Sequence, residues 1–87
     1  MLFRSYYYMK VREENGISCL DLHGVSHAEA PVEVVDFCYQ YQESIPLILI
    51  CGNSSKMLGI VSKTLEAHDI SFDSPRYGII RILSFNH

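Results

Sequence analysis

The hydrophobic positions of the chain alternate with polar ones in some segments and follow helical spacing in others. Strict alternation or a short apolar run is typical of a strand, whereas apolar residues three and four apart are typical of an amphipathic helix. The pattern predicts two strands at residues 6–11 and 17–22, a helix at 26–42 and a third strand at 46–51. A second helix follows, from the turn at 53–55 to about residue 68. Two further strands are predicted at 70–72 and 78–85, joined by a turn at 73–76. This alternation predicts two crossovers, which are almost always right-handed and place both helices on one side of the sheet.

Local signals bear on the boundaries of these elements. Asn15-Gly16 lies between the first two strands and is typical of a two-residue hairpin turn. Ser26 and Glu29 have capping-box spacing at the start of the first helix. Pro31 conflicts with that start, because a proline beyond the first turn removes a hydrogen bond and can shift the helix start later. We infer a two-layer α/β sandwich on a mixed sheet, with the two helices on one face.

Composition and charge restrict the classes of function. The 87 residues are 48% apolar and 20% charged, as in a soluble globular domain, and the apolar run at 46–51 is far too short to span a bilayer. Cys19, Cys38 and Cys51 form neither a close pair nor an even set, which is typical of reduced thiols. We therefore expect a cytoplasmic protein without membrane contact. The net charge of -3 disfavours binding to nucleic acid, because Lys and Arg must neutralise its phosphates; we therefore expect such binding to be weak and local.

The segment Leu20-Asp21-Leu22-His23-Gly24 is the first candidate site. Residues two apart in a strand share a face, so Asp21 and His23 point together while the leucines face the core. A carboxylate and an imidazole placed together are groups that proton transfer uses. The segment therefore predicts a site at the end of a strand.

The second candidate site follows the apolar run at 46–51, where a glycine and polar residues lead into the second helix. Free N–H groups and the helix dipole favour an anion at such a helix entrance, and Lys56 adds positive charge. Both candidate segments follow the carboxyl ends of strands, where ligands of open α/β sheets bind. Adjacent strands would therefore bring the two segments together.

Four alternatives stay open at this point. Asp21 can cap the turn while His23 bonds to backbone at the helix start, and residues 54–56 can be an ordinary N-cap. A zinc site could be formed by Asp21, His23 and His27, although two histidines four apart across a glycine turn do not share a helix face. Cys51 can be a nucleophile paired with His23, although its apolar neighbours indicate a buried, inert thiol.

Together these motifs resemble the Smr (small MutS-related) domain, a module found at the end of MutS2 proteins and in stand-alone forms. The resemblance covers about residues 18 to 85 and rests on Leu20-Asp21-Leu22-His23-Gly24, Glu29-Ala30, Cys51-Gly52-Asn53-Ser54, and Leu58, Val61 and Leu65. It divides the chain into an N-terminal strand and hairpin extension, residues 1–17, and an Smr-like domain, residues 18–87. The second family motif usually reads His-Gly or Thr-Gly, any residue, then Gly. Here Cys51 and Ser54 replace its first residue and its second glycine.

The resemblance implies a fold similar to the C-terminal domain of translation initiation factor three, and endonuclease activity on structured DNA or RNA in some members. Asp21 and His23 match the family's acidic and histidine positions and are the expected catalytic residues. The expected phosphate-binding residues are Gly24, Gly52, Asn53, Ser54, Ser55, Lys56 and Arg81. Arg81 lies inside the apolar run at 79–83, so it either faces solvent or pairs with an acid.

Two hypotheses of different classes follow. The first is an Smr-like nucleic-acid-binding domain connected with DNA repair that nicks its substrate; it requires no cofactor, although Asp21 is compatible with holding a divalent cation such as Mg²⁺. The alternative is a non-catalytic Smr-like interaction module that binds a protein partner. In that case the apolar sheet face left without helices is the candidate surface for a partner or for a homodimer.

Overall fold

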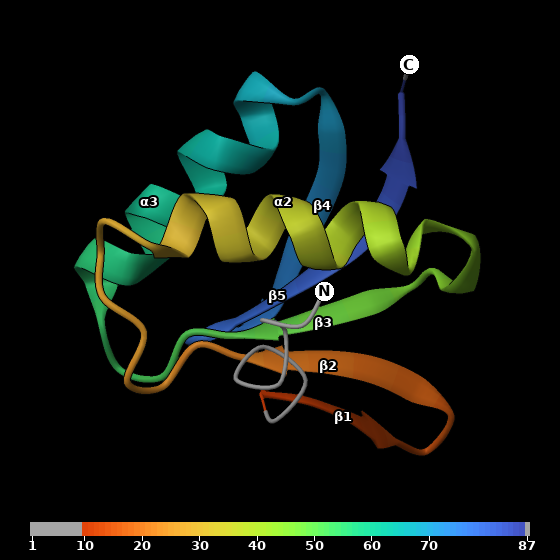
Figure 1. The fold of residues 1–87 in the computed structure, drawn as a ribbon, viewed down its shortest axis with the longest axis horizontal. Helices are drawn as coiled ribbons and strands as arrows, with labels where there is room; N and C mark the ends of the chain where they lie inside the picture. The colour runs from red at the N-terminus through yellow and green to blue at the C-terminus, as the bar shows by residue number, and fades with distance from the viewer. Residues whose placement is uncertain (1–9, 87) are drawn as a thin grey trace, which may run out of the picture.

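The computed structural model describes residues 10–86 and begins with a β-hairpin (Figure 1). Its strands are β1 (Val11–Glu14) and β2 (Ile17–Asp21). Asn15 and Gly16 have φ values of 55° and 82°, the left-handed pair that a tight two-residue hairpin turn needs. The predicted hairpin is confirmed. Of the strand predicted at 6–11, residues 6–9 lie outside the described residues.

Helix α2 (Ala30–Gln40) begins four residues later than the capping-box spacing predicted. Ser26 accepts the Glu29 N–H through its side-chain oxygen, at 3.2 Å, so the capping contact is present but closes a turn ahead of the helix. Pro31 then lies in the first helical turn, where its missing N–H costs nothing. The helix is followed by a short 3₁₀ helix, η1 (Gln42–Ser44).

Strand β3 (Leu47–Ile50) leads into helix α3 (Ser55–Ala67). Ser54 is the N-cap, and its side-chain oxygen accepts a 3.0 Å hydrogen bond from the Met57 N–H. The predicted apolar stripe of this helix was Met57, Leu58, Val61 and Leu65. Met57, Val61 and Leu65 are buried as predicted, and Leu58 is half-buried against the core.

The last two strands are β4 (Ile70–Arg76) and β5 (Ile79–Phe85), and they correct the turn predicted at 73–76. Those residues continue β4 through a register shift between Asp73 and Arg76. The Ser74 hydroxyl bonds to the carbonyl oxygens of Arg76 and Ile79, at 3.0 and 2.8 Å, so the irregular backbone stays attached to β5. Proline is tolerated at such a place because β4 is an edge strand.

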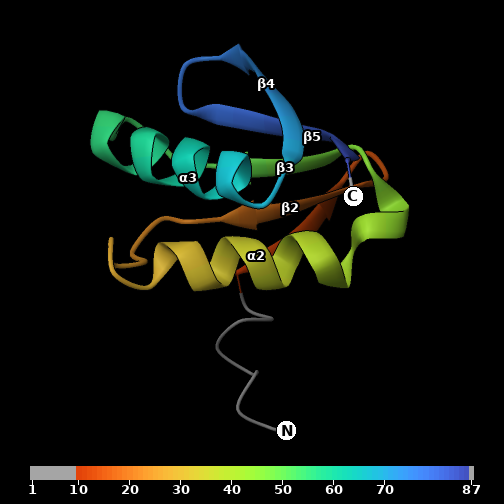
Figure 2. The ribbon, with the colours of Figure 1, turned by 90° about the horizontal axis from the view of Figure 1, so that it is seen from above.

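The sheet order is β1-β2-β3-β5-β4, and β2 pairs with β3 in parallel while the other neighbouring pairs are antiparallel. Strand β4 therefore runs parallel to β3 with β5 between them, so both helices are crossover connections. The helices contact each other and pack against the sheet (Figures 1 and 2). The predicted two-layer α/β sandwich on a mixed sheet is confirmed. Within residues 10–86, no helix has the length and apolar character needed to cross a membrane.

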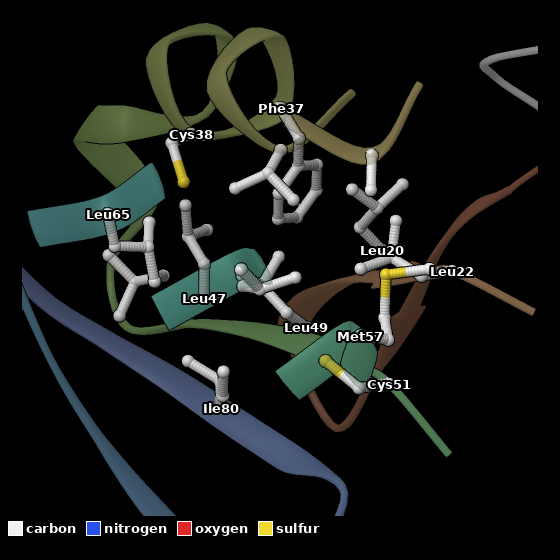
Figure 3. Packing of buried hydrophobic residues seen from close by; sticks show 14 of the residues in the cluster. Leu20, Leu22, Phe37, Cys38, Leu47, Leu49, Cys51, Met57, Leu65 and Ile80 are labelled. Atoms are coloured by element: carbon white, nitrogen blue, oxygen red, sulfur yellow. The ribbon is translucent and has the colours of Figure 1, made fainter. Parts of the chain in front are cut away.

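The helices cover one face of the sheet, and the two faces therefore differ in what packs against them (Figure 2). Alternate residues of β2, β3 and β5 are buried in the core, among them Leu20, Leu47, Leu49 and Ile80 (Figure 3). On the opposite face lies a hollow of about 500 Å³, and its apolar lining includes Ile17, Cys19, Ile48, Ile50 and Ile79. The core thus holds β2 and β3 firmly side by side, which determines where their following loops lie.

Candidate functional site

The loops that follow β2 and β3 leave the sheet next to each other (Figure 1). Asp21 is opposite Ile50 in the parallel pair, and the Leu22 N–H continues the pairing with a 2.9 Å hydrogen bond to the Ile50 carbonyl oxygen. The predicted convergence of the two motif segments is therefore observed. We use "the rim" for the residues gathered at this end of the sheet, namely Lys10, 21–24, 51–56 and 77–78.

Asp21 uses both carboxylate oxygens within the protein. Oδ1 accepts the His23 backbone N–H at 2.9 Å, and Oδ2 accepts the Arg12 guanidinium at 3.2 Å. Partial burial alone would raise the pKa of Asp21, but the His23 N–H and Arg12 outweigh it and lower that pKa. Asp21 is therefore ionised at neutral pH and fixes the backbone of His23, as the turn-capping alternative predicts.

His23 and Gly24 form the exposed end of the first loop. The Lys10 ammonium donates a 2.8 Å hydrogen bond to the His23 carbonyl oxygen. Lys10 therefore places a positive charge beside this loop, and the sequence analysis did not predict it. The signal was available, because a two-residue turn at Asn15-Gly16 sets the hairpin register and puts residue 10 opposite Asp21.

Cys51 at the start of the second loop points into the core beside Met57 (Figure 3). Burial raises the pKa of its thiol to about 11, so at neutral pH it carries its proton. This contradicts the nucleophile alternative. Gly52, Asn53, Ser55 and Lys56 are exposed.

The entrance of α3 has a side-chain cap at Ser54. Ser54 satisfies the Met57 N–H, which is the ordinary N-cap alternative for this residue. A helix leaves about four N–H groups without intrahelical partners at its start. A capped entrance can therefore still offer N–H groups to an anion.

The turn between β4 and β5 is a third component of the rim that the sequence interpretation missed. The Cys51 N–H donates a 2.7 Å hydrogen bond to the Gly78 carbonyl oxygen, and a Cβ added at Gly78 would collide with the carbonyl oxygen of Gly52. The Tyr77 hydroxyl lies 3.5 Å from the Asn53 carbonyl oxygen. Placing the turn at 73–76 concealed this contact, although Tyr77-Gly78 directly precedes an apolar run.

Arg81 is not at the rim. It lies within β5 opposite Ile48, two residues inward from Ile79. Its guanidinium donates two hydrogen bonds to the Asp73 carboxylate, at 3.0 and 2.6 Å, and this contact lowers the pKa of Asp73. Of the two alternatives for Arg81, facing solvent or pairing with an acid, the structure shows the pair with an acid. It does not bring Arg81 together with the other predicted phosphate ligands.

Metal ligation has little support from the part of the chain that the structure describes. Residues 10–86 contain no group of three or more His, Cys, Asp or Glu side chains placed to hold an ion. Asp21, His23 and His27 therefore do not gather into the zinc set considered above. Each Asp21 carboxylate oxygen accepts one hydrogen bond within the protein, from Arg12 or from the His23 N–H.

Comparison with family models, with curated proteins and with solved structures returned no match. The similarity to Smr domains, and to the C-terminal domain of translation initiation factor three, therefore stays a prediction from the motifs.

Proposed function

We propose that this chain is an Smr-like domain that acts in the cytoplasm and binds the phosphate backbone of nucleic acid at the rim. The observation that carries the proposal is the parallel pairing of β2 with β3, which brings the two motif loops side by side. A phosphate at this place would meet the entrance of α3 and the exposed loop of His23 and Gly24. Helix entrances favour anions through their unpaired N–H groups and the helix dipole.

Charge supports weak and local binding. Lys10 and Lys56 lie on the rim, whereas the whole chain carries a net charge of -3. A lysine in the first turn of a helix opposes the dipole unless an anion lies nearby. Lys56 is therefore better suited to a rim that holds a phosphate than to an empty one, and we expect the affinity to fall steeply with salt.

Nicking of the bound strand is the further step that the family resemblance implies. The exposed imidazole of His23 would exchange a proton with the attacking water or the leaving oxygen, and Asp21 would hold the His23 backbone in place. Asp21 thus acts as a positioning residue in this proposal.

The proposal is tested with branched DNA and structured RNA in a gel assay at low salt. We expect the wild-type protein to shift both substrates and to nick at least one. Asp21→Ala combined with His23→Ala should keep most of the shift and lose nicking, and His27→Ala, an exposed histidine of the same loop, should behave as wild type. Equal cleavage by the wild type and the double variant would show that the catalytic assignment is wrong.

A second candidate function is a non-catalytic interaction module, and the helix-free sheet face favours it. That face has an apolar centre with Arg12, Glu14 and Arg76 around it. A protein partner, of which a second copy of the chain is the simplest case, would cover the half-buried isoleucines of this face. No gel shift at low salt, together with self-association in sedimentation that Ile48→Glu abolishes, would favour this candidate over nucleic-acid binding.

A further inference from the structure

Tyr77 is a large aromatic residue at the rim, and its side chain is exposed to solvent. It is 62% exposed, and its hydroxyl lies against the Asn53 carbonyl oxygen of the second motif loop. The turn that carries it is attached to that loop by the hydrogen bond between Cys51 and Gly78. The ring is therefore kept beside the proposed phosphate-binding loop without being buried in the core.

The turn also has little freedom to carry the ring away. Gly78 has a φ of 86° and packs so closely on Gly52 that no side chain fits between them. The contact joins the β4–β5 turn to the β3 loop as one surface. An aromatic ring on a fixed turn is a stacking partner that loses little conformational entropy on binding.

We propose that Tyr77 is a base-stacking platform, and that the ligand of the rim is a single-stranded or looped nucleic acid. This inference rests on the proposed function, since it assumes a phosphate at the entrance of α3. A flat ring beside a phosphate site fits an unpaired base, because every base presents a π-face while a base inside a duplex is already stacked. Recognition would then depend on strandedness more than on sequence.

Binding of a labelled 16-mer of oligo(dT), compared with the same strand paired to oligo(dA), tests the inference. We expect the wild type to bind the single strand more tightly. Tyr77→Ala should weaken single-strand binding by about 5- to 150-fold, which corresponds to the loss of one stacked base, and change duplex binding much less. Tyr77→Phe should retain the preference, because it keeps the ring. Leu83→Ala, which removes a 42% exposed apolar side chain elsewhere on the same hairpin, should have no effect.

A spectroscopic measurement separates stacking from support of the loop. The chain contains no tryptophan, so Tyr77→Trp introduces a single indole. Stacking of a base on that indole should quench its fluorescence on addition of oligo(dT), to an extent that saturates with binding. A Tyr77 that merely supports the Asn53 loop would leave the emission unchanged.

The outcomes distinguish this inference from the function on which it rests. If the single strand and the duplex bind equally and Tyr77→Ala binds as wild type, while Lys56→Ala still weakens binding, the stacking platform is wrong and the phosphate site stands. If neither strand form binds at low salt, the proposed function fails and this inference fails with it. Tight binding with unquenched indole emission would also overturn the platform.

Discussion

At the scale of single residues, Asp21 is the best-defined polar group of the rim. Its alternation with Leu20 and Leu22 was predictable, because a strand with one covered face buries every second side chain. Its partners were not predictable, since Arg12 lies opposite Cys19 and reaches Asp21 only diagonally, and the bond to His23 depends on the turn beyond the strand. Sequence motifs thus located the residue, and the hairpin determined what it contacts.

Asp21 should couple stability to pH in a defined direction. Its folded-state pKa lies below the ordinary value of 3.8, so its contribution is fully present above that value and is lost as the pH falls through the folded pKa. We expect Asp21→Ala to lower the free energy of unfolding by about 1–2 kcal/mol at pH 7. Asp21→Asn keeps an acceptor for the His23 N–H and should cost less.

Urea unfolding of the wild type and both variants between pH 7 and pH 2.5 measures this effect. The difference between wild type and Asp21→Asn should be constant near neutrality and shrink below about pH 4. Arg12→Gln is the matched background, and in it the cost of Asp21→Asn should be smaller. A difference that persists unchanged at pH 2.5 would contradict the role assigned to the carboxylate.

At the scale of elements, the rim depends on the close contact between the β3 loop and the β4–β5 turn. Gly78 has left-handed backbone geometry and no room for a Cβ. We expect Gly78→Ala to destabilise the protein by about 2 kcal/mol or more, because both the strained φ and the collision with Gly52 must be relieved.

A second glycine gives a matched comparison for that substitution. Gly59 lies in α3 with nothing within 4 Å of an added Cβ, so Gly59→Ala should raise stability by up to about 1 kcal/mol. Thermal unfolding of the two variants measures both effects. A stabilising Gly78→Ala, or two substitutions of equal effect, would show that the contact does not hold the rim together.

The elements also show where sequence patterns lose precision. The apolar stripe of α3 and the hairpin turn at Asn15-Gly16 were predictable, because each depends on neighbours close in sequence. The start of α2 was predicted too early. The cap at Ser26 closes a separate turn, and the helix begins only at Ala30, which places Pro31 in its first turn. The turn predicted at 73–76 was wrong, because β4 continues its pairing with β5 through this segment and accommodates Ser74-Pro75 as an irregularity in the register.

At the scale of the whole molecule, sheet order decides which segments meet. Parallel pairing of β2 and β3 follows from the first crossover, and the sequence predicted that their loops would converge if these strands were adjacent. The insertion of β5 between β3 and β4 was not predictable from local pattern, and it brings Tyr77 and Gly78 to the rim. The same order leaves Arg81 in the middle of the sheet, paired with Asp73.

The most direct test of phosphate binding at the rim is the salt dependence of affinity for oligo(dT). Lys56 lies at the entrance of α3, and Lys63 lies seven residues further along the same helix and is also exposed. For single strands the slope of log affinity against log salt is about 0.7 for each phosphate neutralised. We expect Lys56→Ala to weaken binding and reduce that slope by about this amount, and Lys63→Ala to leave both unchanged. Equal effects of the two substitutions, or a slope that Lys56→Ala does not alter, would contradict the account.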